Sequence, residues 1–150
     1  MKLIILLLLL INYSVFNMDL TRQTPIEKSI FLKGELGVKH FYLPNELIFD
    51  TGKLYKLIIK NESDSKHYFG SVMFSKSIFT RKIQLIKNSK KVAEVKGIIN
   101  EIELWPNETL EWWFVPIKTG IFKDLQCKVE DIESKLNHSE MGMVGTIIIK

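Results

Sequence analysis

The sequence predicts an all-β fold, a sandwich or barrel of seven or eight strands. Short apolar runs alternate with polar residues at a period of two, and turn residues separate these runs. The 150 residues are enough for one hydrophobic core and too few for two ordinary domains. With only eight Gly, four Pro and 25% charged residues, the composition excludes a disordered or low-complexity chain.

The N-terminus carries a targeting signal. Lys2 is followed by nine uninterrupted aliphatic residues, Leu3 to Ile11, which is the length of a signal-peptide apolar region and is too short to span a membrane. We expect a signal peptide over residues 1–17, with a retained N-terminal anchor as the alternative because no small-x-small cleavage triplet follows. The predicted location is therefore the periplasm or the cell exterior, with no membrane contact beyond the leader.

Residues 18–36 have an irregular pattern that contains Pro25 and Gly34, which is typical of a connecting arm. The domain itself is expected over residues 37–150. Its clearest strand is Leu54–Lys60, in which Tyr55, Leu57 and Ile59 share one face. The same pattern predicts further strands at Val38–Leu43, His67–Phe74, Lys82–Ile86, Ile98–Leu104, Thr109–Val115, Ile121–Cys127 and Val144–Ile149, with a brief helical crossover at Phe74–Phe79.

The run Thr109–Val115 holds the most bulky residues. Leu110, Trp112 and Phe114 fall on one face of this strand and are expected in the core, whereas Trp113 falls on the other face. Because Pro106 and Asn107 form a turn before the strand and Pro116 ends it, the strand is well bounded.

The charge pattern and the cysteine count exclude several classes of function. The net charge is +4, but Lys and Arg are interleaved with acidic and apolar residues, so we expect no nucleic-acid partner. A single Cys excludes an intramolecular disulfide, a Cys-x-x-Cys redox pair and a dinuclear copper centre.

The C-terminal third contains candidate metal ligands in a suggestive order. Cys127 ends a strand, His138 follows after ten residues, and Met143 precedes the last strand. With an upstream imidazole from His67, which follows the polar loop Asn61–Ser65, these residues form the donor set of a blue-copper site. Met141 is a second nearby thioether, less favoured as the axial ligand. We expect His40 to be a structural or exposed residue rather than a ligand.

These motifs resemble those of the cupredoxin family over residues 38–150. The matching elements are the Asn-containing loop leading to His67-Tyr-Phe, the strand entry Pro106-Asn-Glu-Thr-Leu-Glu-Trp, the lead-in Gly120-Ile-Phe to Cys127, and His138 followed by Gly142-Met143-Val-Gly145. The resemblance implies an eight-stranded Greek-key sandwich that binds one copper ion per chain. It assigns His67 and His138 as nitrogen ligands, Cys127 as the thiolate and Met143 as the axial sulfur. It departs from many cupredoxins in the length of the segment between Cys127 and His138.

The resemblance implies an electron carrier, with His138 as the likelier solvent-facing ligand and a redox protein as partner. The sequence contains no catalytic constellation, so we expect a protein that is not an enzyme. We expect a monomer. Two alternatives remain open from the sequence, a copper storage or delivery protein with a copper donor or acceptor as partner, and a metal-free binding module. A nucleophilic Cys127–His138 pair and a zinc site are less favoured, because neither explains the thioether.

Overall fold

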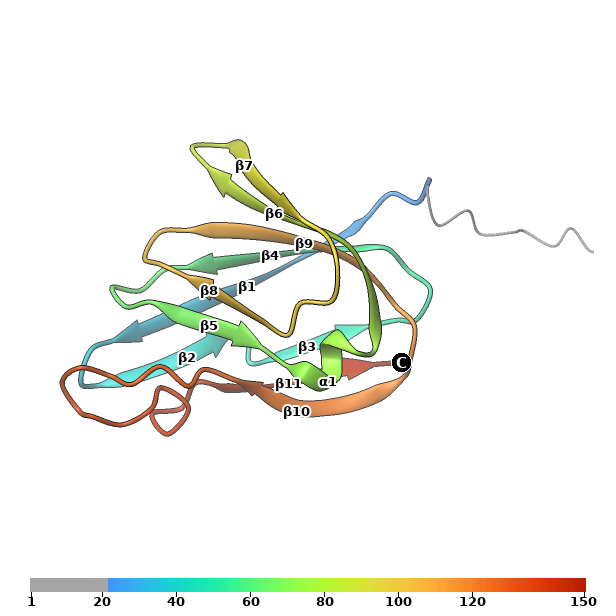
Figure 1. Cartoon of the computed structure of the whole chain (residues 1–150). Coiled ribbons are helices and arrows are strands. Elements are labelled where there is room, and N and C mark those ends of the chain that lie inside the picture. Colours follow the sequence, from blue (N-terminus) through green and yellow to red (C-terminus); the bar gives the residue numbers. More distant parts are fainter. Residues whose placement is uncertain (1–21) are drawn as a thin grey trace, which may run out of the picture.

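A computed structural model describes residues 22–150, which form eleven strands and one short helix (Figure 1). The predicted leader, residues 1–17, lies outside the described residues. In chain order the elements are β1 (Ile26–Glu35), β2 (Lys39–Leu43), β3 (Glu46–Phe49), β4 (Tyr55–Asn61), β5 (His67–Gly70), α1 (Val72–Ser75), β6 (Ile78–Lys87), β7 (Lys90–Val95), β8 (Glu101–Leu104), β9 (Thr109–Pro116), β10 (Gly120–Gln126) and β11 (Val144–Ile149).

The strands form a sandwich, so the predicted fold class is confirmed. Six of them make one sheet in the order β2-β1-β4-β9-β6-β7, while β10-β11-β3 and β5-β8 make two smaller sheets. The pairs β1–β4 and β11–β3 are parallel, and the other pairs are antiparallel. Rings from both smaller sheets, Phe49 on β3 and Phe69 on β5, contact Phe114 and Trp112 of the large sheet across the core.

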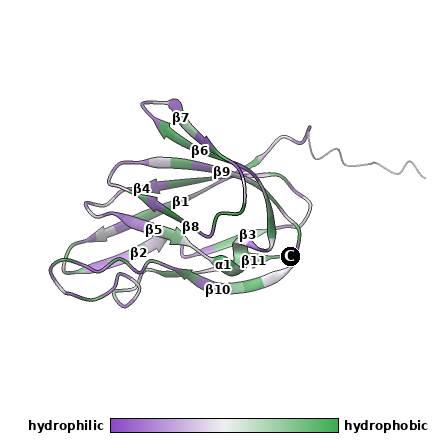
Figure 2. Cartoon of the chain, in the orientation of Figure 1, coloured by the Kyte–Doolittle hydropathy of each residue, from purple (hydrophilic) through white to green (hydrophobic). Residues whose placement is uncertain are grey.

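The core forms where the period-two pattern places it. Leu57 and Ile59 of β4 are fully buried, and so are Trp112 and Phe114 of β9, the strand paired with it. Figure 2 shows hydrophobic and hydrophilic residues alternating along several of these strands. Trp113 lies on the opposite face, where the ammonium group of Lys82 sits 4.4 Å from its ring centroid.

The expectation of a connecting arm over residues 18–36 is wrong for Ile26–Glu35, which forms β1 between β2 and β4. Ile30 and Leu32 are fully buried there. Lys28 and Gly34 interrupt the apolar alternation of this segment, which is why the pattern alone does not reveal a strand.

Two further strands, β3 and β7, were not predicted. Strand β3 has only four residues, too few to show a period. All six residues of β7 are exposed, so this edge strand has no apolar face to detect.

The expected crossover at Phe74–Phe79 is a helix, but it begins earlier, at Val72, because β5 ends at Gly70. Ser71 caps this helix by accepting a hydrogen bond from the backbone N–H of Phe74 at 3.2 Å. The carboxylate of Asp124 in turn accepts from the Ser71 hydroxyl and from the backbone N–H of Met73. No helix in residues 22–150 is long and apolar enough to cross a membrane.

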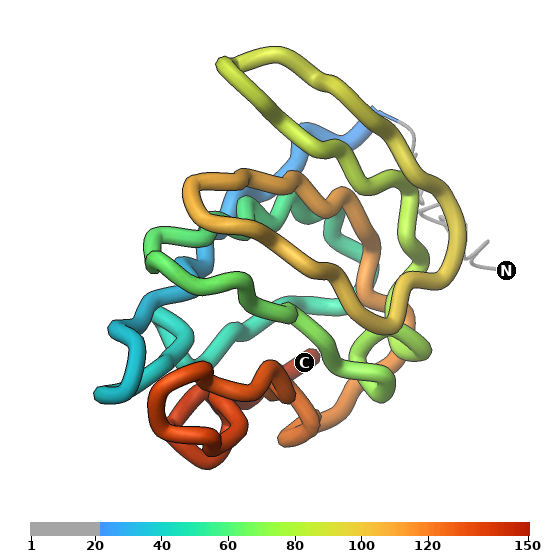
Figure 3. Tube along the Cα trace, turned by 60° about the vertical axis from the view of Figure 1, so that its left-hand side comes forward, coloured from blue at the N-terminus to red at the C-terminus, as the bar shows by residue number. Residues whose placement is uncertain are grey.

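The segment between β10 and β11 positions the candidate metal ligands. Figure 3 shows it, in red, beside the β1–β2 hairpin, in blue and cyan, at one end of the sandwich. A backbone hydrogen bond from Cys127 N–H to Met143 O, 3.2 Å long, closes the base of this segment. We call residues 127–143 the ligand loop.

Candidate metal centre

The fold brings three of the four predicted ligands into direct contact. His67 Nδ1 lies 3.0 Å from His138 Nδ1, and Cys127 Sγ lies 3.9 Å from the first of these atoms and 3.6 Å from the second. None of the three side chains is more than 1% exposed. Donors that each sit about 2.0–2.3 Å from a shared ion are separated by this kind of distance.

The fourth predicted ligand, Met143, is buried in the same cluster as Cys127. Its backbone N–H donates to His138 O at 2.8 Å, while its carbonyl accepts from Cys127, so it is tied to both ligands. The other candidate, Met141, is partly exposed, and its sulfur accepts a hydrogen bond from the Ser134 hydroxyl at 3.2 Å. Burial therefore favours Met143 over Met141.

His67 is oriented by the loop that precedes it. Asn61 holds this loop by donating to the carbonyls of Ser65 and Leu104, and its side-chain oxygen accepts from the backbone N–H and the hydroxyl of Ser63. The Ser63 oxygen lies 2.7 Å from His67 Nε2. When Nε2 carries the proton and donates to Ser63, the lone pair at Nδ1 faces the centre.

Burial keeps both ligand imidazoles neutral near pH 7. It lowers the pKa of His67 to about 3, assisted by the neighbouring rings of His138 and His40. It also lowers the pKa of His138 to about 4, and His40 adds to this shift while Asp131 opposes it. Neutral imidazole is the form that binds a metal ion.

Cys127 is a buried thiol. Desolvation raises the pKa of this thiol, although backbone N–H groups of Tyr68 and Val129 act in the opposite direction. The Tyr68 N–H lies 3.2 Å from Sγ. Because a nucleophilic cysteine needs a lowered pKa, this environment disfavours the nucleophile and suits a thiol that loses its proton when a metal binds.

Asp131 anchors the long ligand loop. Its carboxylate is fully buried and accepts hydrogen bonds from the backbone N–H groups of Glu133, Ser134 and Gly37, the last of which lies between β1 and β2. These bonds hold the pKa of Asp131 well below its usual range. The ten residues between Cys127 and His138 are therefore an ordered connection that is fastened to the β1–β2 hairpin.

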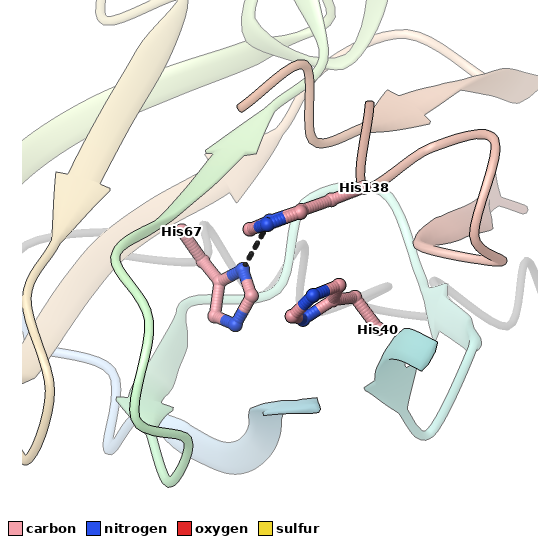
Figure 4. A group of neighbouring side chains, drawn as sticks. All are labelled: His40, His67 and His138. Atoms are coloured by element: carbon pink, nitrogen blue, oxygen red, sulfur yellow. Dashed lines mark hydrogen bonds between the residues drawn. The ribbon is translucent and has the colours of Figure 1, made fainter. Parts of the chain in front are cut away.

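His40 lies beside the predicted ligands, so of its two expected placements, structural or exposed, the exposed one is wrong. It is fully buried, its ring stacks on His138 with centroids 3.7 Å apart, and it meets His67 edge-on at 5.2 Å (Figure 4). Its Nε2 donates to Asp131 at 2.9 Å. One signal could have found it, since His40 lies on the same face of β2 as the buried Tyr42, but its partner Asp131 is 91 positions away.

The expectation that His138 faces solvent is also wrong, because this side chain is only 1% exposed. It does line a hollow of about 180 Å³ together with Leu36, Val129 and Ile132. Its Nε2 atom has no hydrogen-bond partner among the described residues. The centre is thus closed from water but lies directly under the surface.

Comparisons with known proteins bear on the fold. No protein-family model and no curated protein matches the chain. Solved structures do match, including a multicopper oxidase from Campylobacter jejuni described as a metallo-oxidase, with 21% identity over 85% of this chain and 31% of that one, at a TM-score of 0.57. A copper-containing nitrite reductase from Thermus scotoductus matches with 13% identity over 88% and 32% of the two chains, at a TM-score of 0.61.

A copper nitrite reductase from Nitrosomonas europaea matches with 7% identity over 87% of this chain and 52% of that one, at a TM-score of 0.58. These proteins contain cupredoxin-like domains. This chain has the cupredoxin-like fold. It spans between about a third and a half of the length of these three structures.

The comparisons correct one expectation. The sequence led us to expect a protein that is not an enzyme, but the structures that this cupredoxin-like chain matches are enzymes, an oxidase and two nitrite reductases. At these identities the likeness establishes the fold. Together with the imidazole, thiolate and thioether donors, the cupredoxin-like fold supports copper as the cofactor.

Proposed function

We propose that the protein binds one copper ion in a type 1 centre and exchanges single electrons through it. The observation that carries the proposal is the placement of His67 Nδ1, His138 Nδ1 and Cys127 Sγ within 3.0–3.9 Å of one another in a buried site. Two imidazoles, a thiolate and a weak thioether are the donors of a blue-copper centre.

Each residue has a distinct role in this proposal. His67 and His138 would provide neutral nitrogen donors, Cys127 would provide the thiolate after losing its proton, and Met143 would provide a thioether sulfur. Copper supplies one-electron redox chemistry when bound. Ser63 and the Tyr68 N–H hold two of the donors in place before the ion arrives, so the side chains need little rearrangement between redox states.

The leader predicted over residues 1–17 supports export, so we propose that the protein acts in the periplasm or outside the cell, as a monomer with a redox protein as partner. The alternative of copper storage or delivery drew on two thioethers, Met141 and Met143. The Met141 sulfur accepts a hydrogen bond from Ser134, and of the two residues only Met143 is buried, which weakens this alternative.

The test is a titration of the purified protein with Cu(II), followed by visible absorbance. We expect an intense thiolate-to-copper band that saturates at one copper per chain and disappears in Cys127→Ser. Met141→Leu is the matched control and should keep the band. A colourless protein that binds Cu(I) tightly would replace the proposal with storage or delivery, and a protein that binds neither ion would replace it with a metal-free module.

A further inference from the structure

The two imidazole ligands of the proposed copper centre are held in different ways. His67 has a partner for its outer nitrogen, because Nε2 lies 2.7 Å from the hydroxyl oxygen of Ser63. His138 has no such partner, since its Nε2 is buried and forms no hydrogen bond with any of the described residues. Metal-binding histidines almost always donate this second N–H, which fixes the orientation of the ring. Packing must therefore orient the ring of His138.

The ring of His40 supplies this packing. It stacks on the ring of His138, with centroids 3.7 Å apart and ring planes inclined by 24° (Figure 4). An imidazole that turns about its Cβ–Cγ bond needs the space beside its own plane, and on one side of His138 another buried ring fills that space. The stack therefore favours the orientation in which His138 Nδ1 lies 3.0 Å from His67 Nδ1 and 3.6 Å from Cys127 Sγ.

His40 is itself fixed on its other sides. Its Nε2 donates to the buried carboxylate of Asp131 at 2.9 Å, and this carboxylate also accepts from three backbone N–H groups of the β1–β2 turn and the ligand loop. Its Nδ1 lies against Gly34, where a Cβ atom would be only 2.1 Å away. Both ring nitrogens are thus closed to a metal ion, so His40 acts from beside the ligand.

The two stacked rings come from parts of the fold with different rigidity. His138 belongs to the ligand loop, between β10 and β11, whereas His40 belongs to β2, which pairs along its length with β1 in the six-stranded sheet. The backbone N–H of His40 also donates to the carbonyl of Met141 in the ligand loop, at 3.4 Å. A loop residue has fewer backbone constraints than a strand residue. The contacts of His40 therefore tie a ligand on a loop to the sheet.

We propose that His40 is a positioning residue for the copper ligand His138, and that Asp131 holds it in this role. The inference rests on the type 1 centre proposed above and adds to that centre a residue that makes no bond to the ion. Stacking keeps the His138 ring in its binding orientation before the ion arrives, so copper binding does not have to order the ring.

The test replaces His40 with Gln. The amide of Gln can still donate to Asp131, so this variant removes the ring and keeps the fastening of the ligand loop. We expect the Cu(II) affinity, measured in competition with a chelator of known affinity, to fall about 10–100-fold, the range found when an outer-shell partner is lost. The thiolate-to-copper band and the reduction potential should also shift, which a purely structural role of His40 would not cause.

The matched control is Phe41→Ala. It removes a ring from the next position of β2, which lies on the opposite face of the strand and is only partly buried. The affinity, the absorption band and the potential should all stay unchanged in this variant. A His40→Gln variant with the affinity, band and potential of the unmodified protein would overturn the proposal.

A measurement without copper separates this proposal from the type 1 centre. In the unmodified copper-free protein, nuclear Overhauser contacts should join the ring protons of His138 to those of His40 and His67 and define one orientation of the His138 ring. His40→Gln should lose this single orientation. Several orientations in the unmodified protein would overturn the proposal, even if His40→Gln failed to fold. A protein that shows the expected contacts but binds no copper would refute the type 1 centre and leave the orientation of His138 by His40 standing.

Discussion

Ser63 shows how a residue outside the ligand set controls the centre. Its hydroxyl oxygen contacts the outer nitrogen of His67 and is itself held by the Asn61 side chain. Ser65 lies in the same loop, and its hydroxyl is buried without a hydrogen-bond partner among the described residues. The two serines therefore offer a matched comparison.

We predict that Ser63→Ala lowers the affinity for Cu(II) about 10–100-fold, because the imidazole of His67 loses the bond that orients it. The measurement is a competition titration against a chelator of known affinity. Ser65→Ala should leave the affinity within error of the unmodified protein. Similar affinities for the two variants would show that Ser63 has no orienting role.

The predicted ligands can be recognised from the sequence more easily than the residues that orient them. His67, Cys127, His138 and Met143 stand out because the order of donor types is itself informative. Asp131 and His40 do not stand out, because their hydrogen bond joins positions 91 residues apart and no local pattern reveals it. Ser63 lies four residues from His67, but the sequence does not say that the loop folds back onto the ring.

Strand β9 contributes the most central residues of the hydrophobic core. Phe114 is fully buried and packs against Phe49, Tyr55, Phe74 and Trp112 with ring centroids 5.1–5.9 Å apart. Phe79, on the neighbouring strand β6, is 61% exposed. The same residue type thus occurs inside and outside the sandwich.

We predict that Phe114→Ala lowers the free energy of unfolding by about 3–5 kcal/mol, since it removes a buried ring and leaves a cavity. Phe79→Ala should change it by about 0.5 kcal/mol or less. Urea denaturation of the copper-free protein measures both values. Comparable losses in the two variants would contradict the placement of the core.

The strands that could be predicted are those with one apolar face, such as β4 and β9. The pattern fails for β1, whose inward face includes the small residue Gly34, and for β7, which packs on neither face. These failures have a physical basis. An apolar side chain at position 34 of β1 would clash with His40. An exposed edge strand such as β7 needs no apolar residues.

For the whole molecule, the buried imidazoles couple stability to pH. The pKa of His67 is about 3 and that of His138 about 4 in the folded protein, below the ordinary value of 6.5. Between pH 6.5 and these lowered values, the unfolded chain therefore binds more protons than the folded chain. The free energy of unfolding falls as the pH drops through this range. Asp131, whose pKa is also lowered, adds a loss in the same direction at lower pH.

We predict that the free energy of unfolding of the copper-free protein, measured in urea, is greatest above about pH 6.5 and decreases steadily toward pH 4. His67→Gln and His138→Gln should each flatten this decrease, because each removes one group that titrates in the unfolded chain only. A stability that is constant between these pH values would contradict the burial of both rings.

The order of the ligands along the chain has a consequence for when a metal can bind. Cys127, Asp131, His138 and Met143 all follow β10, whereas His40 and the Gly37 turn lie near the start of the described chain. The complete donor set exists only once the ligand loop has closed and β11 has paired with β3. The predicted ligands can therefore meet only in a nearly complete sandwich, because three of the four lie in its last segment.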